Sequence, residues 1–168
     1  KDKNVFTKPD TILNHVKNQI KAIVDSCIPK TSLPKYGGGD WNDTKQPKNK
    51  MLTEKMVSTW TVSLIYQAFN NFSKCVSKID QDLSNLINEF LTNLKRDYEK
   101  YIMIDNKPAG FIIFEDDKPR PLLHPNDDKT KISYRLLSYQ RPIIAELIND
   151  EQAELNHELM LRHQIMNL

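Results

Sequence analysis

The sequence predicts a mainly α-helical fold that contains one β-hairpin. Three observations lead to this prediction. Apolar residues recur at helical spacing over long stretches, which gives about five helices. Near residue 102 the pattern changes to two short apolar runs separated by Asn, Pro and Gly, which is typical of a hairpin. Only four glycines occur in 168 residues, and three of them stand side by side in a polar stretch.

Composition places limits on the partners of this chain. Apolar residues make up 39% of it and charged residues 27%, which is ordinary for one domain with a single core. A net charge of +2, not concentrated on one helical face, argues against nucleic acid and anionic membranes. No apolar run reaches the roughly 18 residues of a transmembrane helix, and the first residues lack a signal-peptide pattern. We therefore expect a cytoplasmic protein in which Cys27 and Cys75 are buried free thiols.

Three long helices are predicted in the first two thirds of the chain. The first spans residues 9–28, with Pro9 in its first turn and an apolar stripe along one face. The second spans 53–79 and is apolar around more than one face, so it should be buried on several sides with Trp60 in the core. The third spans 80–101 and carries a single apolar stripe. Thr53 and Asp80 are the expected N-caps, and the tight connection predicts an antiparallel helical hairpin.

The remaining elements are shorter. Residues 102–104 and 111–114 read as the two strands of a β-hairpin that must pack on the helices. Residues 115–138 contain three prolines and are expected to be irregular, with His124 in a structural role against the body. Two helices are predicted at 139–149 and 150–166, separated at Asn149, with their apolar side chains facing the core. The histidine spacings of the chain do not match a metal site, so we predict none.

The polar stretch 29–50 contains the chemistry-bearing residues. Gly37, Gly38 and Gly39 permit a close backbone approach to a ligand. Asp40 and Asp43 offer acid or base groups, and the indole of Trp41 offers a flat apolar face for a sugar ring. A plain flexible turn would have the same glycine and aspartate composition. The three lysines at 45, 48 and 50 are expected to be solvated, although they could also attract an anion such as phosphate.

The string Gly-Gly-Gly-Asp-Trp-Asn-Asp at 37–43 resembles the catalytic motif of the cellobiose-phosphorylase-like glycoside phosphorylases. That family includes chitobiose phosphorylase and the phosphorylase-like part of cyclic β-glucan synthases. The stretch 56–72 resembles the helix that follows the motif, and 122–125 with 134–137 resembles a downstream part of some members. The resemblance implies that residues 1–168 are a single partial domain, an internal fragment of a longer catalytic domain that folds as an (α/α)₆ toroid.

The resemblance also implies a role for each residue of the motif. Asp43 would be the general acid that protonates the glycosidic oxygen of a β-linked oligosaccharide. Trp41 and Asn42 would line the sugar site, while Asp40, Gly38 and Gly39 would hold the loop in place. Inorganic phosphate would be the co-substrate, with no other cofactor. It would attack the anomeric carbon from the opposite face and give a sugar 1-phosphate of inverted configuration.

Two features leave other functions open. Thr44-Lys45-Gln46 follows the motif where the usual phosphorylases have Gly-Met-Asn, and the downstream His and Thr/Ser-Gly that bind phosphate have no counterpart that we can place. An inverting glycoside hydrolase with Asp40 as the base fits the same string. So does a non-catalytic helical module that binds carbohydrate or protein. We expect the fragment alone to be inactive, and to expose apolar helix faces that would contact the remainder of the polypeptide or a second copy.

Overall fold

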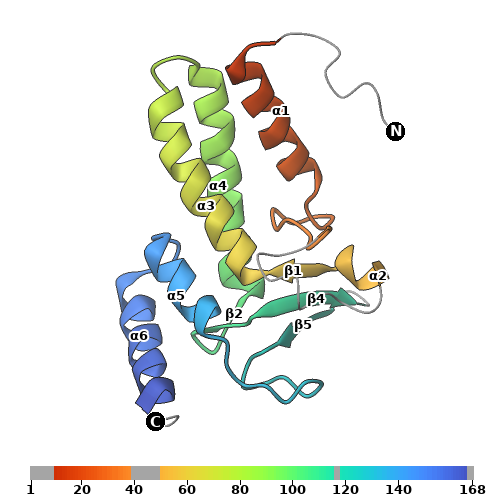
Figure 1. The fold of residues 1–168 in the computed structure, drawn as a ribbon, viewed down its shortest axis with the longest axis vertical. Coiled ribbons are helices and arrows are strands. Elements are labelled where there is room, and N and C mark those ends of the chain that lie inside the picture. The colour runs from red at the N-terminus through yellow and green to blue at the C-terminus, as the bar shows by residue number, and fades with distance from the viewer. Residues whose placement is uncertain (1–9, 39–49, 116–117, 166–168) are drawn as a thin grey trace, which may run out of the picture.

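The computed structural model describes residues 10–38, 50–115 and 118–165. These residues form a mainly helical structure with two small antiparallel sheets. In Figure 1 the long helices α1, α3 and α4 lie above a sheet of three short strands, and α5 and α6 lie below and beside it. The elements are α1 (Ile12–Asp25), α2 (Lys50–Thr53), β1 (Met56–Ser58), α3 (Thr59–Val76), α4 (Gln81–Tyr101), β2 (Met103–Ile104), β3 (Lys107–Pro108), β4 (Phe111–Glu115), β5 (Lys118–Leu122), α5 (Leu136–Ile144) and α6 (Asp150–Ile165).

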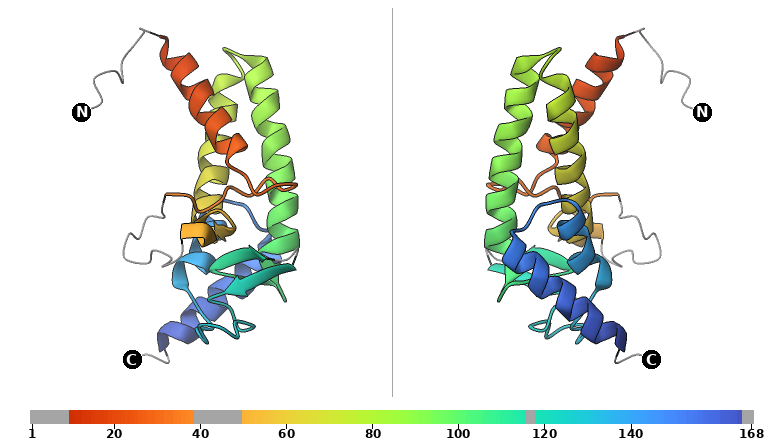
Figure 2. Two further views of the ribbon diagram at one scale, coloured as in Figure 1. Left: turned by 90° about the vertical axis from the view of Figure 1, so that its right-hand side faces the viewer. Right: turned by 90° about the vertical axis from the view of Figure 1, so that its left-hand side faces the viewer.

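The predicted helical hairpin is confirmed in α3 and α4, which run antiparallel and side by side in every view (Figures 1 and 2). Asp80 caps α4 as predicted, since its Oδ1 accepts a hydrogen bond from the Leu83 amide at 3.0 Å. The rings of Phe69 and Phe90 pack between the two helices with centroids 5.7 Å apart. Asp80 also forms an ion pair with Lys17 at 2.6 Å, which fixes α1 against the connection between α3 and α4.

Helix α1 is confirmed with a later start and an earlier end than predicted. Thr11 caps it by accepting a hydrogen bond from the Asn14 amide at 3.2 Å, while Pro9 lies outside the described residues. At the end of α1 the chain reverses direction. Cys27 and Pro34 form an isolated antiparallel β-bridge, and the Ile28 amide donates a hydrogen bond to the Leu33 carbonyl at 2.9 Å. The reversal leads directly into the polar stretch that carries the glycines.

The prediction of one helix over 53–79 is wrong in its first part. Thr53 does not cap a long helix but ends the short α2, and the next residues form β1 before α3 begins at Thr59. All three residues of β1 are buried, and Val57 pairs with Ile112 of β4. A short apolar run that is buried on both faces has no helical or strand period to distinguish it, so tertiary pairing decides its conformation. Trp60 is half-buried beneath the Arg141 guanidinium rather than enclosed in the core.

The predicted β-hairpin also pairs differently. Strand β2 turns back on β3 through Asp105 and Asn106, which both have positive φ, the conformation of a two-residue hairpin turn. The second predicted strand, β4, belongs to another sheet with strand order β1-β4-β5. Strand β5 lies in the stretch that was expected to be irregular. It accommodates Pro119 and Pro121 because it is an edge strand, where a missing N–H breaks no ladder.

Of the two C-terminal helices, α6 begins where the sequence pattern predicts and α5 does not. Helix α5 starts three residues before the predicted position, at Leu136. Asn149 and Gln152 exchange side-chain-to-backbone hydrogen bonds of 2.9 and 3.2 Å and so cap α6, which confirms the predicted break. The inward face of α6 is polar, and Gln152 donates to Glu99 on α4 at 2.9 Å. Leu155, which was predicted to face the core, is 36% exposed, so that prediction is wrong.

Both cysteines are free thiols, as predicted, but only one of them is protected from solvent. Cys75 is exposed on α3, which corrects the expectation that it is buried. Cys27 is half-buried, and burial raises the pKa of its thiol to about 11. Within the described residues no helix is long and apolar enough to cross a membrane. In the same part of the chain, no three His, Cys, Asp or Glu side chains are grouped so as to hold a metal ion.

Candidate active site

The structure describes the approach to the predicted motif and the return from it. Gly38 is exposed in a turn, and no atom of the described residues, its chain neighbours aside, lies within 4 Å of the position that a Cβ would take there. Gly39, Asp40, Trp41, Asn42 and Asp43 lie outside the described residues. The geometry of the site is therefore the geometry of the two chain segments that hold the motif, which we call the stem: residues 35–37 on one side and 53–56 on the other.

Backbone hydrogen bonds join the two sides of the stem. The Tyr36 amide donates to the Met56 carbonyl at 2.6 Å, and the Gly37 amide donates to the Thr53 carbonyl at 3.0 Å. An ion pair of 2.6 Å between Lys35 and Glu54 adds to them. Gly37 has φ +56°, a left-handed conformation that glycine adopts without the steric cost of a side chain. The first glycine of the motif is thus required by the turn that leaves the stem.

A small apolar cluster includes residues of the stem and packs it against β4. Its buried members are Tyr36, Met56, Phe111, Ile113 and Leu123. Tyr36 meets the ring of Phe111 edge-to-face at a centroid distance of 6.1 Å. The guanidinium carbon of Arg135 lies 4.5 Å from the centroid of the same Phe111 ring, as in a cation–π contact. We call these three residues the Arg135–Phe111–Tyr36 stack.

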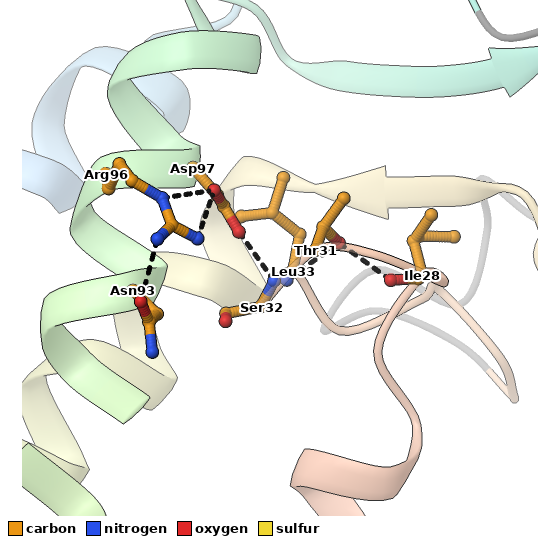
Figure 3. A network of polar contacts seen from close by, with 7 residues as sticks. All are labelled: Ile28, Thr31, Ser32, Leu33, Asn93, Arg96 and Asp97. Atoms are coloured by element: carbon orange, nitrogen blue, oxygen red, sulfur yellow. Dashed lines mark hydrogen bonds and ion pairs between the residues drawn. The ribbon is translucent and has the colours of Figure 1, made fainter. Parts of the chain in front are cut away.

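The segment that precedes the stem is anchored to α4 by a buried carboxylate (Figure 3). Asp97 is only 3% exposed, and its Oδ2 accepts a hydrogen bond from the Ser32 amide at 2.7 Å. Its other oxygen accepts from Arg96 Nε at 3.0 Å, which balances the buried charge. The Thr31 hydroxyl closes the turn by donating to the Ile28 carbonyl at 2.9 Å. The chain therefore enters the stem from a fixed position on the helical hairpin.

His124 lies in the loop after β5 and has the structural role that was expected. It is 1% exposed, its Nε2 lies 3.2 Å from the Ile104 carbonyl, and its Nδ1 accepts from the Asn126 amide at 3.0 Å. This pattern requires a neutral ring with the proton on Nε2. Burial lowers the pKa of His124, and the hydrogen bond to Ile104 opposes this only in part.

The lowered pKa of His124 predicts a loss of stability in acid. The unfolded chain takes up a proton near the ordinary histidine pKa, while the folded chain resists it until a lower pH, so the free energy of unfolding falls as pH drops through that window. Urea unfolding at about pH 7.5 and about pH 5.5 measures the effect. We expect His124→Gln to lose less stability than the unchanged chain over this range, and His157→Gln, at an exposed position on α6, to behave like the unchanged chain. Equal losses in all three proteins would contradict the assignment.

A separate groove of about 740 Å³ lies between α1 and α4. Apolar side chains and charged ones line it together: Ile20, Val24, Leu83, Leu86 and Phe90 among the former, Lys17, Lys21, Asp82 and Glu89 among the latter. None of the residues of the stem lines it. Its volume is large and carboxylates line it, but it lies apart from the two segments that flank the motif, so we place the candidate site at the stem and not in this groove.

No family model matches the chain. Comparison with known proteins nevertheless shows that it is homologous to a segment of a glycoside phosphorylase, which confirms the resemblance predicted from the motif. The relative is the 1,2-beta-oligoglucan phosphorylase of Listeria innocua serovar 6a. It is 35% identical to this chain over 166 residues, which cover 97% of the chain. The chain spans only 15% of the length of that phosphorylase.

Sequence reasoning selected the motif but not the residues that hold it. Asp97 is one acidic residue among several on a long helix, and nothing in its neighbours along the chain indicates a contact with Ser32. Arg135 appeared only in a stretch that resembles other members, without a role. Both residues act through contacts with segments that are distant in the sequence, so no local pattern could identify them.

Proposed function

We propose that this chain is part of the catalytic domain of an inverting glycoside phosphorylase that acts on β-1,2-linked oligoglucans. Two observations together support the proposal. The similarity to a 1,2-beta-oligoglucan phosphorylase extends along nearly the whole of the present chain. The present chain also contains the acid-bearing motif, between two segments that are joined by hydrogen bonds. The substrate class follows from the relative, and the reaction type from the motif.

In the proposed reaction Asp43 donates its proton to the glycosidic oxygen as the bond from that oxygen to the anomeric carbon breaks. Trp41 and Asn42 line the sugar site, and Asp40, Gly38 and Gly39 shape the loop. Phosphate attacks the anomeric carbon from the opposite face, so the products are a glucose 1-phosphate of inverted configuration and a glucan shorter by one unit. Phosphate arrives already charged, so no second carboxylate is needed to activate it, unlike water in an inverting hydrolase.

The proposed fold of the whole catalytic domain is an (α/α)₆ toroid to which this chain contributes a part. The hairpin of α3 and α4, with α1 beside it, has the antiparallel arrangement from which such a ring is built. Ile12 on α1 and Ile79 after α3 are 84% and 76% exposed, and apolar side chains so exposed are expected to be covered by other helices. The remainder of the polypeptide would supply them, and a second copy of the chain is the alternative.

Phosphate dependence tests the proposal on the full-length polypeptide that contains this chain. We expect a β-1,2-linked glucan to yield glucose 1-phosphate in the presence of inorganic phosphate and to remain intact without it. Release of free glucose without phosphate would assign the protein to the inverting hydrolases instead. Binding of the glucan without turnover under either condition would favour the non-catalytic module.

A further inference from the structure

Arg135 is a buried cation at a junction of several elements. It is only 8% exposed, although a guanidinium is costly to remove from water unless its surroundings compensate for the lost hydration. Its Nη1 donates to the Gly110 carbonyl at 3.5 Å, and the same carbonyl accepts from the Thr59 amide at 3.2 Å. The guanidinium therefore lies where α3 begins and where the chain enters β4.

From this junction a chain of contacts extends to the motif. The Arg135 guanidinium lies over Phe111, the first residue of β4, whose register partner is Ser58 of β1. Phe111 in turn meets Tyr36, whose amide closes the stem through the Met56 carbonyl. Gly37, with its left-handed backbone, follows at once. A side chain from the start of α5 thus supports the ring that sets the position of the stem.

We propose that Arg135 is a positioning residue for the reaction: through the Arg135–Phe111–Tyr36 stack it fixes the stem from which the acid-bearing motif extends. The inference rests on the proposed function, because it assigns the motif a proton-transfer step whose geometry matters. Catalysis of this kind depends steeply on placement, and a misplacement of about 1 Å can lower a rate by about 100-fold.

The chemistry of the stack calls for arginine in particular. A planar guanidinium can contact the face of an aromatic ring and still donate a hydrogen bond to a carbonyl. Arg135 makes both contacts, with its guanidinium carbon 4.5 Å from the centroid of the Phe111 ring and its Nη1 3.5 Å from the Gly110 carbonyl. A lysine ammonium keeps the charge but has no plane to stack. Arg135→Lys is therefore the informative substitution, because it removes the stacking geometry while it retains the cation.

The leaving group of the substrate separates a positioning role from a merely structural one. In the full-length polypeptide we expect Arg135→Lys to lower kcat for the β-1,2-linked glucan by about 10- to 100-fold. With 2,4-dinitrophenyl β-glucoside, in which dinitrophenolate takes the place of the shortened glucan as leaving group and departs without a proton, we expect a loss of less than about threefold. Arg120→Lys is the matched control: Arg120 lies on β5 in the same sheet, pairs with Glu115 at 2.9 Å, and should leave both rates unchanged.

Four outcomes would contradict either this inference or the function on which it rests. Equal losses on both substrates would show that Arg135 acts only through stability and would overturn the inference, as would unchanged rates on both. If the unsubstituted polypeptide does not phosphorolyse the glucan, the proposed function itself fails first. Hydrogen exchange gives an independent readout that needs no turnover: in Arg135→Lys the Tyr36 and Gly37 amides should exchange at least about tenfold faster while those of α4 do not change. Unchanged exchange at the stem would also reject the inference.

Discussion

Asp43→Asn is expected to lower kcat for phosphorolysis of a β-1,2-linked glucan by about 10²- to 10⁴-fold, the usual contribution of a general acid. The amide keeps the size of the side chain and its hydrogen-bonding capacity but has no proton of suitable acidity to give to the glycosidic oxygen. Release of glucose 1-phosphate by the full-length polypeptide, followed under saturating substrate, measures the loss. Circular dichroism and the melting temperature of the variant check that a lost rate is not a lost fold.

Two further carboxylates provide the controls for this result. Asp128→Asn, at an exposed position after β5, should retain full turnover. Asp40→Asn tests the alternative of an inverting hydrolase, in which a second carboxylate would activate water. In a phosphorylase it should reduce the rate far less than Asp43→Asn. If Asp43→Asn turns over the glucan at the normal rate, the acid lies elsewhere and the role given to the motif is wrong.

The second large effect is expected on stability, from Gly110→Ala. A Cβ on Gly110 would lie 2.7 Å from Leu123 Cβ and 3.0 Å from its Cδ1, closer than carbon atoms can approach. Leu123 cannot easily move away, because it is buried and already has a left-handed backbone with φ 55°. We expect the free energy of unfolding to fall by about 3 kcal/mol, at the upper end for overpacking.

Urea unfolding of the 168-residue chain measures this difference, and Gly38→Ala is the matched control. The same methyl group added at exposed Gly38 meets no atom of the described residues outside its chain neighbours within 4 Å, so its effect should stay within about 0.5 kcal/mol. Comparable stability of the two variants would mean that Leu123 and Gly110 are not packed as the structure shows.

The parts of the fold that the sequence predicts well are those in which a local pattern coincides with burial. Helix α4 has one apolar stripe and a capping aspartate, and both its span and its cap are confirmed. The strands are different. Met56–Ser58 is too short and too uniformly buried to show a period, and β5 contains two prolines that argue against any strand except one at an edge. The conformation of β1 and of β5 is decided by pairing with β4, which lies between these two strands.

The candidate site divides in the same way. Residue types and spacing predict that Gly-Gly-Gly-Asp-Trp-Asn-Asp is the chemical part, and this stays a prediction, because residues 39–43 lie outside the described residues. The supports depend on pairs such as Tyr36 with Met56 and Arg135 with Phe111, which come together only after the helices and the sheet have formed. A single sequence holds no record of such distant pairs.

The hydrogen-bonded stem has a consequence for how such a protein can diversify. Because Tyr36 and Gly37 are tied to Met56 and Thr53, the ends of the intervening stretch are already brought together by the scaffold. The entropy of closing a loop grows slowly with its length, by only about 0.6 kcal/mol for each doubling. We therefore expect the scaffold to tolerate insertions and deletions after Asp43. Related proteins can then change their sugar preference in this stretch while they keep the same fold.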